Sequence, residues 1–158
     1  MSTAAGAPAK RKLGLHLFLR AMLSPVAFGA HALVEDEHGR ILLARHTYTY
    51  RHGWLLPGGG AGRGEAASDA VIRELREEVG LTAYRSCELF GLYTRKSVLA
   101  TNAIALFRVR GAVLSFRPNF EVREIVFADP AAPPPGTAPG VLRRLAELRG
   151  EAPQSLYW

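Results

Sequence analysis

The chain has 158 residues, of which 48% are hydrophobic and 22% charged. This length and composition suit one soluble globular domain that is long enough to bury a substantial core. The formal net charge of +6 favours anionic ligands, and the single cysteine, Cys87, excludes an internal disulfide and a zinc site made of cysteines. We expect an N-terminal extension over residues 1–24, a domain body over residues 25–150 and a tail over residues 151–158.

The N-terminal extension carries a basic cluster at residues 10–12 and then an apolar run at residues 13–23. His16 and Arg20 interrupt this run, which is also too short to span a bilayer. We expect a short amphipathic helix that lies against the domain of a cytoplasmic protein, with no membrane partner. Contact of the basic cluster with a membrane surface is the alternative.

Two strands are predicted before the glycine-rich part of the chain. Val26–Val34 is apolar almost throughout and is expected to be buried on both faces, whereas Ile41–Arg45 returns after a turn at Gly39. His31 is expected to be a core histidine rather than a ligand. The segment at residues 46–53, HTYTYRHG, is open to two interpretations: it lines a base or phosphate pocket, or it is an exposed strand and loop.

A glycine-rich loop precedes the most informative helix of the sequence. Residues 54–64, WLLPGGGAGRG, contain five glycines, which let the backbone approach a ligand closely, although a purely structural turn is the alternative. From Ala66 to Val79 the apolar residues recur at helical spacing, and Gly80 supplies the stop. We expect an amphipathic helix in this place.

Three acids of this helix, Glu74, Glu77 and Glu78, fall along one flank of its apolar stripe. Like charges about 4 Å apart near a surface oppose each other by roughly 4 kcal/mol. Protonation, neutralisation by arginine, or a divalent cation can offset this repulsion, and ligands that are all oxygen select Mg²⁺ or Mn²⁺. The alternative is a solvated acidic face in which Arg73 pairs with Glu77 one turn on.

Beyond the helix the chain alternates strands and loops. Two long strands are expected at Thr82–Thr94 and Ala100–Arg110, linked by a basic turn, and a short strand at Ile125–Ala128. Between them residues 116–124 form a polar loop. A closing helix is expected at Val141–Leu148.

The ends of the closing helix carry two further expectations. Thr137 is a candidate cap for its first turn. Tyr157 and Trp158 are expected to pack back on the domain or on a second subunit, in which case the chain forms a homodimer.

The stretch from Gly59 to Leu81 resembles the Nudix box, whose pattern is Gly, five residues, Glu, seven residues, then Arg-Glu-apolar-x-Glu-Glu-x-Gly-apolar. The chain fills every specified position, with Gly59, Glu65, Arg73, Glu74, Leu75, Glu77, Glu78, Gly80 and Leu81. The segments just before the box also resemble this family. The resemblance extends over Val26–Asp129, and so long a pattern is far more specific than a lone glycine motif.

The resemblance to Nudix hydrolases implies an α/β fold, an α/β/α sandwich with a mixed curved sheet, over residues 25–150. It implies a hydrolase that depends on Mg²⁺ or Mn²⁺ and cleaves the pyrophosphate linkage of a nucleoside diphosphate linked to another moiety, through a water molecule that the metal activates. The implied metal ligands are Glu74, Glu77, Glu78 and a backbone carbonyl at Gly59, and Glu65 is implied to brace the acidic cluster.

For the acids outside the implied metal ligands, the sequence leaves several roles open. Members of this family draw a further Glu from the loop at residues 116–124, so Glu121 and Glu124 are candidates for metal ligand or general base, with two surface acids as the alternative. Glu74 is the third candidate for the base.

Arginines are expected to bind phosphate or to order the site. Arg73 is expected to fix the glutamates of the box. Arg45, Arg51 and Arg95 are candidates for phosphate contact from outside the box.

The substrate is a small nucleotide diphosphate derivative by resemblance, and its identity stays open. No proline follows Arg95 in the place typical of members that favour ADP-ribose, and the coenzyme A signature is not met. Nucleoside triphosphates, nucleotide sugars and dinucleotides remain. A non-catalytic sensor that binds a nucleotide or metabolite is the alternative function, but such domains usually lose acids that this box keeps. No nucleic-acid partner is expected, because the sequence lacks a recognisable stacking platform.

Overall fold

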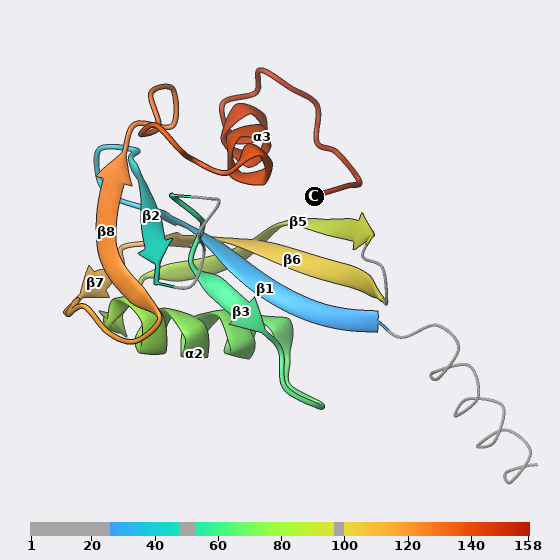
Figure 1. Ribbon diagram of the computed structural model, residues 1–158, viewed down its shortest axis with the longest axis horizontal. Helices are drawn as coiled ribbons and strands as arrows, with labels where there is room; N and C mark the ends of the chain where they lie inside the picture. Colours follow the sequence, from blue (N-terminus) through green and yellow to red (C-terminus); the bar gives the residue numbers. More distant parts are fainter. Residues whose placement is uncertain (1–25, 48–52, 97–99) are drawn as a thin grey trace, which may run out of the picture.

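The computed structural model describes residues 26–47, 53–96 and 100–158. Its centre is a sheet with the strand order β5-β6-β1-β2-β8, and β3 pairs with β1 outside this path. Helices α2 and α3 lie on opposite sides of the sheet (Figure 1). The described part of the chain is therefore the predicted α/β sandwich.

The elements have the following bounds. The helices are α2 (Ala67–Val79) and α3 (Pro139–Leu148). The strands of the large sheet are β1 (Val26–Glu35), β2 (Ile41–His46), β3 (Gly58–Gly60), β5 (Ser86–Lys96), β6 (Thr101–Arg110) and β8 (Val122–Ala128). A separate pair consists of β4 (Leu81–Ala83) and β7 (Val113–Leu114).

The sheet is mixed, as predicted. β1 runs parallel to β6 along its whole length, whereas β2, β3, β5 and β8 pair with their neighbours in antiparallel register. β1 and β2 form a hairpin whose turn contains Gly39 at a φ of 75°. The prediction that the first strand is buried on both faces is wrong for its first three residues, which are exposed. This end of β1 extends past α2 and α3 (Figure 1).

Two apolar cores hold the layers together, one on each face of the sheet. Val71, Leu75 and Val79 of α2 pack on alanines and valines of β1 and β6. On the other face, Val141 and Leu145 of α3 pack with residues from β1, β5, β6 and the segment that contains Trp54 and Leu56. Alternation along β1 and β6 gives each face its own set of side chains.

Three details of the predicted elements are wrong. The strand expected at Thr82–Thr94 is two strands, β4 and β5, because the first pairs with β7 and only the second joins the large sheet. The last strand begins earlier than expected, at Val122, because its pairing partner β2 continues to His46. Thr137 does not cap α3; Ala138 is the cap residue and the Thr137 hydroxyl donates to the Pro134 carbonyl at 2.7 Å.

Some predictions lie outside the described residues. These are the N-terminal amphipathic helix, the middle of the segment at residues 46–53, which includes Arg51, and the tip of the basic turn at residues 97–99. Within the described residues, neither helix has the length and apolar character needed to cross a bilayer.

A charged cluster at the far end of β1 supports the parallel pairing with β6. The Glu35 carboxylate accepts hydrogen bonds from Arg108 at 2.7 and 2.8 Å and from Arg110 at 3.0 Å. These guanidinium groups, Arg108 first, hold the pKa of Glu35 below its usual range. Its side chain is 15% exposed, so the pair is only partly screened by water.

We predict that Glu35→Gln lowers the free energy of unfolding by about 1–2 kcal/mol at pH 7, since it removes a charge-assisted pair. A depressed pKa gives stability that is present above the unfolded pKa and is lost as pH falls through the folded pKa. The difference between wild type and variant should therefore shrink in urea titrations at pH 3. Glu37→Gln, at a site 86% exposed, is the control, and an equal loss there would contradict the prediction.

Candidate active site

The second half of the box forms α2, and the helix positions its three glutamates very differently. The side chain of Glu77 is 56% exposed, that of Glu74 is 13% exposed, and that of Glu78 is 3% exposed. The helix ends as predicted at Gly80, which has a left-handed φ of 70° and donates its N–H to the Leu75 carbonyl. Burial of the last glutamate is the distinctive feature of the site.

Glu78 is held by the backbone of β3. The Gly58 amide donates to its Oε2 at 2.8 Å, and Nδ1 of His46 lies 3.7 Å from its Oε1. Gly58 has a φ of 134°, and a Cβ there would lie 2.2 Å from the Ala30 carbonyl oxygen. Only glycine can bring this amide so close to β1 and to the carboxylate.

Burial raises the pKa of Glu78 to about 8, and the charges of Glu74, Glu121 and Glu77 act in the same direction. The hydrogen bond from Gly58 opposes this shift but does not cancel it. Burial also lowers the pKa of His46. Without a cation, the buried pair is therefore mostly neutral at pH 7, with the proton on Glu78.

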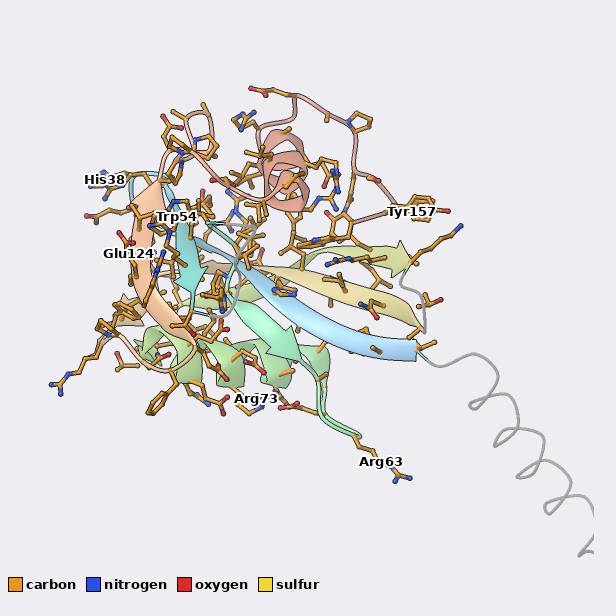
Figure 2. All side chains as sticks on the ribbon, in the orientation of Figure 1. His38, Trp54, Arg63, Arg73, Glu124 and Tyr157 are labelled. Atoms are coloured by element: carbon orange, nitrogen blue, oxygen red, sulfur yellow. The ribbon has the colours of Figure 1, made fainter. Side chains whose placement is uncertain are left out.

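Arg73 bonds the three other glutamates of the box. Its Nη1 lies 2.7 Å from Glu74 and 3.3 Å from Glu77, and its Nε lies 2.9 Å from Glu65. Its Nη2 also donates to the Gly60 carbonyl at 3.0 Å, which ties the helix to the end of β3. Figure 2 shows Arg73 on the outer side of α2.

Glu65 braces this cluster from a position just before the helix. The helix begins at Ala67, and Glu65 accepts the Gly62 amide at 2.6 Å and bonds from Arg73. These contacts, Arg73 first, lower the pKa of Glu65 to about 2. The carboxylate therefore stays ionised and holds the guanidinium through its Nε and Nη2 atoms.

The repulsion predicted from the sequence is thus offset by protonation of Glu78 and by Arg73. No group of three or more His, Cys, Asp or Glu side chains among the described residues is already arranged to hold a metal ion. The donor set nevertheless fits a hard cation. A Cβ at Gly59 would lie 2.7 Å from the Glu74 carboxylate carbon, so Glu74 and Glu78 flank the same strand, and a cation can replace the proton that Glu78 otherwise needs.

The two acids beyond the box are separated by the structure. Glu121 lies just before β8, and its charge acts on both Glu78 and His46. Glu124 lies within β8, not in the expected loop, and its carboxylate pairs with Arg45 at 3.3 Å (Figure 2). Strand alternation from Val122 onward explains this placement. Of these two acids, Glu121 is therefore the one whose charge acts on the buried pair of Glu78 and His46.

The arginines predicted to bind phosphate are likewise in different places. Arg45 pairs with Glu124, and its guanidinium carbon lies 4.9 Å from the ring centroid of Trp54. Arg95, at the end of β5, lines a cavity that also contains Gly58. Arg95 therefore shares a cavity with the backbone that holds Glu78.

Two residues of the site were missed from sequence. His46 ends β2 and its position beside Glu78 depends on the pairing of β2 with β8, which no local pattern encodes. Asn119 donates to the Glu78 carbonyl at 3.0 Å and accepts from the amides of Glu121 and Val122. Its place in a polar loop, where Asn often bonds nearby amides, was the available signal.

The described residues form a layered α/β sandwich in which Glu78 is buried beside β3 and Arg73 bonds three further acids. A family model described as the NUDIX domain matches residues 25–136. The chain belongs to the NUDIX family, as its box predicted. Proteins of this family generally use divalent metal ions and act on small nucleotide derivatives.

Relatives match over short stretches. The chain is 39% identical over 67 residues to a putative 8-oxo-dGTP diphosphatase of Bacillus subtilis, covering 42% of this chain and 43% of that protein. It is 45% identical over 47 residues to an RNA pyrophosphohydrolase of Photobacterium profundum, covering 30% and 26%. The match spans less than half the length of these curated relatives.

Solved structures share the fold over most of the chain. The MutT protein of Methanosarcina mazei gives a TM-score of 0.65 at 23% identity, covering 81% of this chain and 95% of that one. The MutT NUDIX hydrolase of Burkholderia pseudomallei gives 0.69 at 19% identity, covering 79% and 99%. At such identities the likeness establishes the sandwich fold.

We predict that Glu78→Gln stabilises the metal-free protein at pH 8. A carboxyl with a raised pKa must take up a proton on folding, so stability falls as pH rises from about 4.5 to about 8. The glutamine side chain still accepts the hydrogen bond from Gly58 but carries no buried charge. We therefore expect the free energy of unfolding to rise by about 1–3 kcal/mol at pH 8, and this difference to vanish near pH 5. Urea unfolding in a chelator measures it. Glu77→Gln, an exposed neighbour, is the control, and a variant less stable than wild type at both pH values would contradict the assignment.

Proposed function

We propose that the protein is a divalent-metal-dependent pyrophosphohydrolase that cleaves a nucleoside diphosphate linked to another moiety. The single observation that carries this proposal is the burial of Glu78, at 3% side-chain exposure, among the charges of Glu74, Glu77 and Glu121. A carboxylate in this position is unfavourable by itself and becomes favourable beside a cation. A complete box with this geometry favours an enzyme over a non-catalytic sensor.

The proposed ligands of Mg²⁺ or Mn²⁺ are Glu74, Glu78 and the backbone at Gly59, with Glu77 completing the acidic face. When bound, such an ion neutralises phosphate oxygens and lowers the pKa of a water molecule. Arg73 keeps Glu74 and Glu77 in place through its bonds at 2.7 and 3.3 Å. Gly58 fixes Glu78 through its amide, so that the carboxylate oxygens have defined directions.

We assign proton abstraction from the attacking water to Glu121. Its position between the loop held by Asn119 and the start of β8 places its charge near Glu78 and His46. Glu74 is already bonded to Arg73 at 2.7 Å, so its carboxylate is occupied by that guanidinium. Glu124 is occupied by Arg45 on β8.

The substrate is proposed to be a nucleoside triphosphate. The relative from Bacillus subtilis is named for 8-oxo-dGTP and that from Photobacterium profundum for RNA, and the matches to both are too short to choose between them. Phosphate contacts are proposed for Arg45 and the undescribed Arg51, whereas Arg95 lines the cavity that also contains Gly58. The free thiol of Cys87 accords with a reducing compartment, and we propose the cytoplasm.

The decisive experiment is a substrate panel with Mg²⁺ and Mn²⁺. The panel contains dGTP, 8-oxo-dGTP, ATP, a nucleotide sugar, ADP-ribose, a dinucleoside polyphosphate and a short RNA with a 5′-triphosphate, and released phosphate, pyrophosphate and nucleotide are measured. We predict turnover that a chelator abolishes. Glu78→Gln should lower kcat by more than about 100-fold, because loss of a ligand exceeds the 10–100-fold effect of losing an outer-shell partner.

Glu88→Gln is the matched control for that experiment, since Glu88 is 64% exposed and pairs with Arg110 of β6. It should turn over like wild type. Nucleotide binding without product release in any arm would favour a sensor. Unchanged turnover in Glu78→Gln would remove the proposed metal site.

We predict that Glu121→Gln lowers kcat by about 100-fold or more, the usual contribution of a general base, and changes KM little. The acidic limb of the pH profile of kcat should be lost. Glu124→Gln should keep that limb. If Glu124→Gln loses it and Glu121→Gln does not, the two assignments are reversed.

A further inference from the structure

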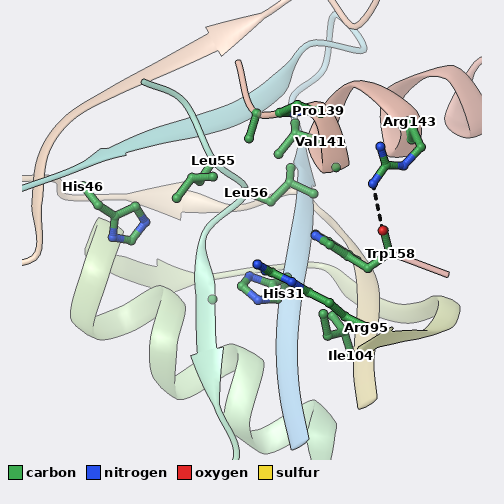
Figure 3. A pocket seen from close by; sticks show the side chains of 13 residues that line it. His31, His46, Leu55, Leu56, Arg95, Ile104, Pro139, Val141, Arg143 and Trp158 are labelled. Atoms are coloured by element: carbon green, nitrogen blue, oxygen red, sulfur yellow. Dashed lines mark hydrogen bonds between the residues drawn. The ribbon is translucent and has the colours of Figure 1, made fainter. Parts of the chain in front are cut away.

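A cavity of about 390 Å³ lies between the sheet and α3, on the face opposite α2. Its volume falls in the range of ligand pockets, about 300–1,000 Å³. The walls come from His31 on β1, Gly58 on β3, Arg95 on β5, the first turn of α3, and Trp158 in the tail (Figure 3). Five separate segments therefore converge on one space.

One end of the cavity is bounded by residues that also contact Glu78. Gly58 lines the cavity, and the same residue donates its amide to Glu78 at 2.8 Å. His46 also lines it, with Nδ1 at 3.7 Å from Glu78. A ligand in this cavity therefore has its near end beside the acidic cluster and its far end beside Trp158.

The tail that carries Trp158 is bound to the domain as an extra strand segment. The Thr94 amide donates to the Leu156 carbonyl at 2.8 Å, and the Trp158 amide donates to the Thr94 carbonyl at 3.1 Å. Arg143 donates to the Trp158 carbonyl at 2.8 Å, the bond drawn in Figure 3. The prediction that these aromatics pack back on the domain is thus confirmed for Trp158, while Tyr157 remains 59% exposed.

A buried arginine fixes the indole itself. Arg144 is fully buried, bonded to Glu147 at 2.7 Å, and its guanidinium carbon lies 4.0 Å from the ring centroid of Tyr93 and 5.4 Å from that of Trp158. A Cβ at Gly140 would lie 2.7 Å from the indole nitrogen, so the glycine makes room for the ring. The wall formed by Trp158 is therefore built into the domain.

The chemistry of the cavity is aromatic and cationic. The rings of His31 and Trp158 have centroids 5.5 Å apart and are tilted by 31°. Burial lowers the pKa of His31 to about 4, so this ring is neutral at pH 7. The described residues that line the cavity include two arginines and no Asp or Glu. Such a lining suits a flat ring whose edge carries hydrogen-bond acceptors, as guanine does with O6 and N7.

We propose that Trp158 is the specificity-determining wall of a base subsite, against which a guanine base packs while Arg95 binds its acceptor edge. This rests on the proposed function for the phosphate end of the ligand. The same subsite discriminates against a base that presents a donor in place of O6, as adenine does, because Arg95 has only donors to offer.

The test is calorimetric binding of GMP, AMP and inorganic tripolyphosphate without metal. For GMP, Trp158→Ala should weaken binding by about tenfold, within the range for base–aromatic stacking, and Trp158→Phe should restore most of it. Arg95→Gln should reduce the preference for GMP over AMP. Tripolyphosphate binding should be unchanged in the Trp158 variants.

Tyr157→Ala is the matched control, since Tyr157 is the neighbour of Trp158, is 59% exposed and is not among the residues that line the cavity. It should bind GMP like wild type. Equal weakening for tripolyphosphate in Trp158→Ala, or unchanged GMP binding, would overturn the proposal. This binding needs no metal and no turnover. If the variants change GMP affinity as expected but the enzyme is inactive, only the proposed hydrolase function is rejected. If the enzyme is active but the variants do not change GMP affinity as expected, only the base subsite is rejected.

Discussion

The hydrogen bond from the Gly58 amide to the buried Glu78 carboxylate organises the active site. It joins the end of α2 to β3, and β3 in turn pairs with β1 at the middle of the sheet. A carboxylate with so little exposure loses most of its hydration, and a single amide replaces only part of it. The site is therefore poised between two states of Glu78, protonated or beside a cation. The fold keeps this group buried because exposing it would break the contact between helix and strand.

Arg73 explains why the acidic residues of the box coexist before any cation binds. Its guanidinium is shared by Glu65, Glu74 and Glu77, so three carboxylates have one partner with a rigid planar geometry. Among the four glutamates of the box, all of which the structure describes, Glu78 is the one outside this group of three. Because three carboxylates share one positive charge, the cluster keeps a net negative charge that attracts a cation. Lysine would give a single point charge and could not hold three acids at once.

The sequence predicted the parts of the site that lie within one helix and its flanking loop. Helical spacing placed α2 and its three acids, and the box pattern identified the family, because these signals are local. The different burial of Glu74, Glu77 and Glu78 depends on how β3 meets the helix, and the position of His46 depends on strand pairing. The expected place of Glu124 in a loop was wrong for the same reason, since β8 starts earlier than its apolar core suggests. Long-range register is not encoded in any short stretch.

The two faces of the sheet divide the work of the proposed enzyme. On the α2 face, the charges are fixed by a pattern of residues that the family box specifies, so the chemistry there is shared. On the α3 face, the cavity is closed by a tail whose docking depends on Gly140, Arg143 and Arg144, none of which belongs to the box. Gly58 is common to both faces, since its amide contacts Glu78 and its backbone lines the cavity. A change in the tail can therefore alter which base is accepted and leave the acidic cluster intact, which separates specificity from catalysis within one small domain.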